Sequence, residues 1–157
     1  MEKIKTVLFV CTGNTCRSVM AEGLLRKALG QAKRSGVKVL SAGTVASDGL
    51  DAARNTIEAM KTEGVDVSGH KTRELTNDLI KDADIILTMD NSQRDEVLRL
   101  EPAAASKTFL LKRFKSDSGF SLPGEDEVSD PMGQAMEVYE RCLEGIRREI
   151  ERIIKFI

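Results

Sequence analysis

The stretch VLFVCTGNTCRS, residues 7–18, decides the fold of this chain. Its first four residues form an unbroken apolar run that is typical of a buried strand, and the helix-like segment MAEGLLRKAL follows its polar residues. The order strand, short polar loop, helix directs backbone N–H groups and the positive end of the helix at one point. The sequence therefore predicts an anion-binding loop, bracketed by Cys11 and Arg17.

The loop has the side chains that a phosphate-binding nucleophile needs. Cys11 would lie at its base, where N–H donors and Arg17 favour the thiolate, the form that attacks. The guanidinium of Arg17 can hold two phosphoryl oxygens and stabilise charge in the transition state. The residues expected to bind phosphate are Thr12, Gly13, Asn14, Thr15, Cys16, Arg17 and Ser18.

Three loop residues have a specific expected role. Gly13 permits a positive φ, and Asn14 is the non-glycine residue that best tolerates the left-handed region, with an amide that can tie the loop to itself. Ser18 can cap the following helix or donate a hydrogen bond to the thiolate. The alternative is that Cys11 is a small buried hydrophobic residue, because a lone C-x5-R pattern often occurs by chance. The absence of G-x-x-x-x-G-K-[ST] excludes a nucleotide-type P-loop.

Length and composition indicate one domain, residues 1–157, with a substantial core. The 24 Lys and Arg residues nearly balance the 25 Asp and Glu residues, so charge points to neither a nucleic acid nor a membrane partner. No apolar stretch has the length of a membrane span, and the apolar run in MEKIKTVLFV is too short for a signal peptide. We therefore expect a cytoplasmic protein.

The cysteines and the single histidine do not form a metal-site pattern. Three cysteines, an odd number without the spacing of a disulfide framework, fit a reducing compartment. A four-ligand zinc site would need all of them together with His70, and a Cys–His nucleophile pair would need His70 to reach Cys11. We expect no metal and no cofactor.

Strand-like and helix-like segments alternate, which predicts an α/β protein with a parallel sheet and helices on both faces. After the first strand, the expected strands are residues 38–43, 83–89 and 108–111. The expected helices are residues 18–33, 52–63, 74–82, 91–100 and 134–157, with Asn91 as the cap of the fourth. In the last helix, Cys142 lies on the apolar stripe and is expected in the core.

Residues 112–131 form the one long irregular connection, and such loops in compact domains are often functional. The connection ends on Asp130-Pro131, where the proline favours an extended Asp130 and breaks any local helix. The carboxyl of Asp130 is therefore expected on a defined loop. The alternative is that Asp130 forms an Asx-turn or is a surface carboxylate.

CTGNTCRS resembles the active-site loop of the low-molecular-weight protein tyrosine phosphatase family, most closely its protein arginine phosphatase branch. The resemblance covers nearly the whole chain, through SAGT at 41–44, ILTMD at 86–90 and SDPMG at 129–133. It implies a three-layer sandwich with strand order 2-1-3-4 and the loop at the point where strand order reverses. The family usually has a proline where Val19 stands, so we expect a loop less rigid by about 0.4–1 kcal/mol.

The resemblance also implies a mechanism. Cys11 would be the nucleophile, Arg17 the phosphate clamp, Ser18 the thiolate partner and Asp130 the general acid. A cysteinyl-phosphate forms and water hydrolyses it with Asp130 as the base, without a metal. Cys16 is either a packed thiol or the partner of Cys11 in a reversible disulfide.

Phosphoarginine on proteins is the expected substrate, and phosphotyrosine is the second choice. A phosphotyrosine pocket needs aromatic walls, whereas this chain has no Trp and its only Tyr lies in the last helix. Met132 stands where tyrosine-specific relatives usually have an aromatic residue, which leaves Phe120 as the one candidate wall. Thr15 occupies a position that is often aliphatic in those relatives and is threonine in the arginine phosphatases; the alternative is tolerated loop variation.

Two other classes of function share parts of this pattern. A thioredoxin-coupled arsenate reductase has a similar loop but needs further cysteines near residues 80–90, where this chain has none. A non-catalytic phosphoprotein-binding module would keep Arg17 but could lose Cys11 or Asp130, and both are present. We therefore expect a metal-independent, cysteine-dependent protein phosphatase that is a monomer and whose partner is a phosphorylated protein.

Overall fold

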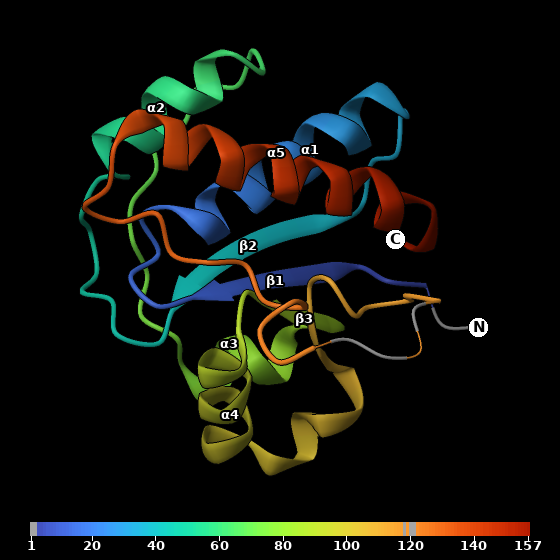
Figure 1. Ribbon diagram of the computed structural model, residues 1–157. Helices are drawn as coiled ribbons and strands as arrows, with labels where there is room; N and C mark the ends of the chain where they lie inside the picture. Colours follow the sequence, from blue (N-terminus) through green and yellow to red (C-terminus); the bar gives the residue numbers. More distant parts are fainter. Residues whose placement is uncertain (1–2, 118, 120–121) are drawn as a thin grey trace.

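A four-stranded parallel sheet forms the centre of the computed structural model, which describes residues 3–117, 119 and 122–157 (Figure 1). Its strands lie in the order β2-β1-β3-β4, so the predicted class and strand order are confirmed. The strands are β1 (Thr6–Cys11), β2 (Lys38–Gly43), β3 (Ile85–Thr88) and β4 (Thr108–Leu110).

Helices cover both faces of the sheet, as the alternating pattern predicted (Figure 1). One face carries α1 (Arg17–Gln31), α2 (Arg54–Lys61) and α5 (Met136–Ile153), and the other carries α3 (Asn77–Asp82) and α4 (Asn91–Leu100). Two 3-10 helices, Pro102–Lys107 and Ile154–Phe156, complete the regular elements of the described residues. None of the helices in that part of the chain is long and apolar enough to cross a membrane.

β1 is buried on both sides because its side chains alternate between two cores. Val7 and Phe9 belong to the larger core, under α1 and α5, whereas Leu8 and Val10 belong to the smaller core, under α3 and α4. β1 also pairs with both β2 and β3, so its carboxyl end lies in the middle of the sheet edge. This end, at Cys11, is where the predicted anion-binding loop begins.

Several element boundaries differ from the prediction. Helix α2 is shorter than residues 52–63, and α3 begins at Asn77 because the Thr76 hydroxyl accepts the Leu79 N–H as its cap. The third strand is shorter than residues 83–89, since only Ile85–Thr88 pairs with a neighbouring strand.

The cap of α4 is also not the one predicted. Asp90, and not Asn91, is the cap, because Asp90 is extended while Asn91 is already helical. The Asp90 carboxylate accepts the N–H groups of Ser92 and Gln93, and the Gln93 side chain accepts the N–H of Asp90 in return.

The position of Cys142 in α5 corrects a further expectation. Its neighbours on the stripe, Tyr139, Leu143 and Ile146, are buried, whereas Cys142 is half-buried at the margin of the core. Its thiol lies 3.9 Å from the carbonyl oxygen of Ser129. The apolar stripe of the sequence is wider than the face of the helix that is buried, so Cys142, at the edge of the stripe, stays partly exposed.

Candidate active site

Residues 11–18, which we call the phosphate loop, lie at the carboxyl end of β1, where strand order reverses between β2 and β3. A cavity of about 210 Å³ opens beside this loop. The residues that line it are Cys11, Thr12, Gly13, Thr15, Cys16, Arg17, Val45, Asp130 and Met132. Most of the residues predicted from the sequence therefore meet in one cavity, while Asn14 and Ser18 lie buried behind it. Phe120 lies outside the described residues.

Cys11 lies at the base of the loop, and the residue is only 2% exposed. The Ser18 hydroxyl is 2.9 Å from the Cys11 sulfur, and the Asn14 N–H donates to it over 3.3 Å. Ser18 does not cap α1, because Cys16 occupies the cap position and makes no capping bond with its side chain. Of the two positions expected for the Ser18 hydroxyl, the structure therefore has the one beside the Cys11 sulfur.

Asn14 holds the loop in shape, as its residue type predicted. It is completely buried and has a φ of 57°, in the left-handed region. Its side-chain N–H2 group donates to the hydroxyls of Ser18 (2.8 Å) and Ser41 (2.9 Å), and its oxygen accepts the Arg73 N–H (2.9 Å). The side chain thus ties the phosphate loop to β2 and to the segment before α3.

The glycine that the loop requires is Gly43 at the end of β2, and not Gly13. The φ of Gly13 is not positive, and a Cβ there would meet Thr15 Oγ1 at an ordinary 3.6 Å. A Cβ on Gly43 would lie 2.5 Å from the carbonyl oxygen of Thr12 and 3.0 Å from the nitrogen of Asn14. The expected conformational role of Gly13 was therefore wrong, and the close approach occurs between the loop and β2.

Arg17 lines the cavity, but the residue is only 2% exposed. Its guanidinium is held in place by several contacts. Its Nη1 lies 3.0 Å from Asp90 Oδ2 and donates to the carbonyl oxygen of Val128 over 2.8 Å. Its Nη2 donates to Thr12 Oγ1 over 3.4 Å and lies 3.7 Å from Asp130 Oδ2. One nitrogen therefore anchors the guanidinium, and the other faces the predicted acid.

Asp90 is a site residue to which the sequence assigned no role. Burial alone would raise its pKa, but hydrogen bonds from Ser92 and Arg17, together with the charge of Arg17, outweigh it and hold the pKa of Asp90 below its usual range. Asp90 and Gln93 match the spacing of a capping box, which could have marked Asp90 as the helix cap. Nothing in that pattern shows that the second carboxylate oxygen contacts Arg17.

The backbone of the phosphate loop supplies further donors. Within the described part of the chain, several N–H groups of the loop and of the start of α1 donate no hydrogen bond, among them those of Gly13, Thr15, Cys16, Arg17 and Ser18. Free N–H groups at a helix N-terminus attract anions. The loop can therefore hold the oxygens of a phosphoryl group above Cys11.

Asp130 faces the cavity from the loop and also forms the Asx-turn that was its alternative. Its Oδ1 accepts the Met132 N–H over 3.0 Å, which is an Asx-turn, and its side chain is 47% exposed. Its Oδ2 faces Arg17 at the cavity, as the loop before Pro131 led us to expect. The turn fixes one oxygen and leaves the other available for proton transfer.

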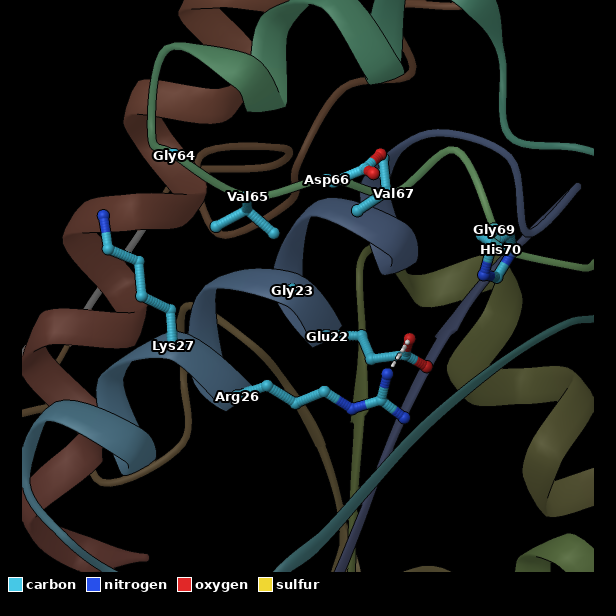
Figure 2. Close-up of a pocket in the computed structure, with 10 residues that line it drawn as sticks. All are labelled: Glu22, Gly23, Arg26, Lys27, Gly64, Val65, Asp66, Val67, Gly69 and His70. Carbon is cyan, nitrogen blue, oxygen red and sulfur yellow. Dashed lines mark ion pairs between the residues drawn. The ribbon is translucent and has the colours of Figure 1, made fainter.

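His70 does not form a pair with Cys11. Its Nε2 lies 2.9 Å from the carbonyl oxygen of Asn14, so it supports the loop from behind. His70 also lies at the edge of a second cavity of about 530 Å³ between α1 and residues 64–70, in which Glu22 and Arg26 form an ion pair at 3.1 Å (Figure 2). The described residues that line this larger cavity include no cysteine, serine or threonine, so we place the candidate active site at the smaller one.

Cys16 makes the contacts of a packed thiol. It is 3% exposed, and its thiol donates to the Tyr139 hydroxyl oxygen over 3.7 Å. Burial, reinforced by the contact with Cys16, raises the pKa of Tyr139 to about 12. These contacts leave the second interpretation of Cys16, a partner for Cys11 in a disulfide, as a prediction.

Mild peroxide is expected to join Cys11 to Cys16. Peroxide would oxidise the Cys11 thiolate to a sulfenic acid, and the Cys16 thiol would displace water from it to give the disulfide. Activity should then return with a dithiol reductant, whereas a Cys16→Ser variant should lose this recovery. Peptide mapping after oxidation is the measurement. A sulfinic acid on Cys11 without any disulfide would leave Cys16 with a packing role alone.

A parallel strand that ends in an anion-binding loop with a cysteine and an arginine is typical of cysteine-based phosphatases. The sequence model of one family in this class, described as low molecular weight phosphotyrosine protein phosphatase, matches residues 6–157. This chain belongs to that family, whose activity implies phosphorylated proteins as substrates.

Relatives with different activities have similar identities to this chain. A probable low molecular weight protein-tyrosine-phosphatase, EpsP, of Ralstonia nicotianae is 36% identical over 148 residues, 94% of this chain and 92% of the relative. A protein-arginine-phosphatase of Geobacillus stearothermophilus is 34% identical over 147 residues, again 94% and 92%. An arsenate reductase of Staphylococcus aureus is 32% identical over 148 residues, 94% and 95%.

The solved structure of the YwlE arginine phosphatase from Geobacillus stearothermophilus has the same fold. It superposes with a TM-score of 0.84 at 33% identity, covering 96% of this chain and 91% of that one.

Proposed function

We propose that this chain is a metal-independent protein phosphatase that hydrolyses phosphoarginine on proteins. The Cys11 thiolate attacks phosphorus, so that an S–P bond forms and the P–N bond to the guanidino group breaks, while Asp130 protonates the departing nitrogen. Water then attacks the phosphorus of the cysteinyl-phosphate and gives its proton to Asp130. The S–P bond breaks, so that phosphate is released and the thiolate is restored. Arg17 and the loop N–H groups stabilise the phosphoryl oxygens in both steps.

The observation that carries the proposal is the setting of the Cys11 sulfur. It lies between the Ser18 hydroxyl at 2.9 Å and the Asn14 N–H at 3.3 Å, at the base of a cavity that also contains Arg17 and Asp130. Hydrolysis of para-nitrophenyl phosphate by the pure protein with excess chelator would separate an enzyme from a phosphoprotein-binding module. A protein that binds phosphate but turns over no substrate would contradict the proposal.

Phosphoarginine is favoured because the cavity has no aromatic wall among the described residues. Thr15 of the loop and its neighbours Val45 and Met132 line the cavity, and they offer a hydroxyl and aliphatic surface. A tyrosine ring gains most from aromatic neighbours, whereas the guanidino group is planar and polar and its stem is aliphatic. Phosphotyrosine is the second candidate, because EpsP, a probable protein-tyrosine-phosphatase, is as similar to this chain as the arginine phosphatase is.

The Thr15→Ile variant is expected to lower the ratio of phosphoarginine to phosphotyrosine turnover by roughly tenfold or more. Thr15 lines the cavity together with Cys11 and Asp130, so we expect its side chain to meet the first atoms beyond the phosphorus. Isoleucine removes a hydroxyl that can bond a guanidino nitrogen or orient the attacking water, and it adds apolar surface for a ring. The measurement is kcat/KM for matched phosphoarginine and phosphotyrosine peptides.

Thr15→Ser is the control for this experiment, since it keeps the hydroxyl at the same position. Its turnover ratio should stay close to that of the native protein. If the Thr15→Ile variant has an unchanged ratio, specificity depends on other residues, with Met132 and Phe120 the next to test.

A further inference from the structure

Gln93, in the first turn of α4, is a completely buried amide whose hydrogen-bonding capacity is fully used. Its Oε1 accepts the N–H groups of Met89 (2.9 Å) and Asp90 (2.8 Å). Its Nε2 donates to Asp90 Oδ2 and to Thr12 Oγ1, both over 3.1 Å. A side-chain amide has two N–H donors and one oxygen that can accept two hydrogen bonds. If the oxygen and the nitrogen of Gln93 exchanged places, these four partners would not all be satisfied.

These contacts also settle which end of the amide faces the phosphate loop. The two backbone N–H groups, of Met89 and Asp90, can only donate, so the atom between them must be the oxygen of Gln93. The nitrogen therefore faces Thr12. Gln93 can only donate to the Thr12 hydroxyl and cannot accept from it.

A second donor approaches the same hydroxyl. Arg17 Nη2 donates to Thr12 Oγ1 over 3.4 Å, and a guanidinium has no acceptor. Both lone pairs of the Thr12 oxygen are thus occupied by groups that cannot take its proton. No described residue accepts a hydrogen bond from this hydroxyl within the chain, and Thr12 lines the 210 Å³ cavity. The hydroxyl hydrogen is left to point toward the cavity.

We propose that the Thr12 hydroxyl donates a hydrogen bond to the phosphoryl oxygen that Arg17 Nη2 holds, and that Gln93 is the positioning residue that fixes this direction. Because Thr12 Oγ1 and Arg17 Nη2 are 3.4 Å apart, both can reach one oxygen. The donor is preorganised, since Gln93 and Arg17 are buried and cannot rotate freely. The inference rests on the proposed function only in requiring a phosphoryl group in this cavity.

The Thr12→Val variant tests the donor, because valine has the same shape without the hydroxyl. Titration of backbone amide chemical shifts with inorganic phosphate should show affinity reduced by roughly tenfold, as for a lost hydrogen bond to a charged group. Thr12→Ser, which keeps the hydroxyl, should bind within about twofold of the native protein. Equal phosphate affinity in the native and Thr12→Val proteins would overturn the proposal. This binding test needs no turnover, so its failure is distinct from a failure of the phosphatase assay.

Gln93→Glu tests the positioning role while keeping oxygens for the N–H groups of Met89 and Asp90. A carboxylate oxygen would then face the Thr12 hydroxyl and accept its proton, so the hydroxyl would turn away from the cavity. The same oxygen would face Asp90 Oδ2, and its added negative charge would weaken phosphate binding whether or not the Thr12 hydroxyl is present. The added charge should reduce phosphate affinity in both backgrounds, and the loss should be larger where Thr12 is present, because only there is a hydroxyl turned away from phosphate. An identical loss in both backgrounds, with unfolding temperatures measured for each, would overturn the role of Gln93.

Discussion

Cys11→Ser should lose turnover by a factor on the order of 10⁶ while it still binds phosphate. The serine hydroxyl would occupy the position of the sulfur, within reach of Ser18 and the Asn14 N–H. An alcohol is almost never ionised near neutral pH. His70, the one histidine of the chain, contacts the carbonyl oxygen of Asn14 and not the serine that would replace Cys11. The phosphate donors, Arg17 and the loop N–H groups, are unchanged, so binding should persist.

Turnover is best measured with para-nitrophenyl phosphate and with a phosphoarginine peptide, each with excess chelator. The matched control is Cys142→Ser, which changes a half-buried cysteine that does not line the cavity and should leave the rate unaltered. Substantial activity in the Cys11→Ser protein would assign the nucleophile to another group.

The phosphate loop could be predicted because its chemistry is local. Cys11, Asn14, Arg17 and Ser18 lie within eight consecutive residues, and the strand and helix that flank them fix their relative positions. Residue type alone indicated the left-handed φ of Asn14. Gly13 shows the limit of this reasoning, because two adjacent residues could both adopt that conformation and the sequence does not decide between them.

The remaining parts of the site come from other strands and depend on register. Gly43 meets the phosphate loop because β2 pairs with β1 so that Cys11 lies opposite Gly43. Asp90 and Gln93 reach Arg17 and Thr12 only because β3 lies next to β1 on its other side. A sequence pattern can indicate that Asp90 and Gln93 cap a helix. Which residues of the phosphate loop they contact depends on the order and pairing of the strands.

Asp130→Asn should lose about 10²–10⁴-fold in turnover of substrates whose leaving group needs a proton, such as phosphoarginine. Asparagine keeps the oxygen that accepts the Met132 N–H, so the Asx-turn and the path of the loop before Pro131 should survive. What it removes is the proton that the second carboxyl oxygen, beside Arg17, would deliver. The loss should be much smaller with para-nitrophenyl phosphate in the first step, because para-nitrophenolate leaves without a proton.

The comparison of these two substrates separates an acid from a residue that only shapes the loop. Asp117→Asn provides the matched control, since it changes an exposed carboxylate in the same connection that does not line the cavity. It should leave both rates unaltered. If Asp130→Asn instead causes an equal and small loss with both substrates, then Asp130 transfers no proton and its contact with Arg17 is that of a surface carboxylate. A large loss confined to the poor leaving group can arise only if Asp130 acts on the departing atom, because a distorted cavity would slow both substrates alike.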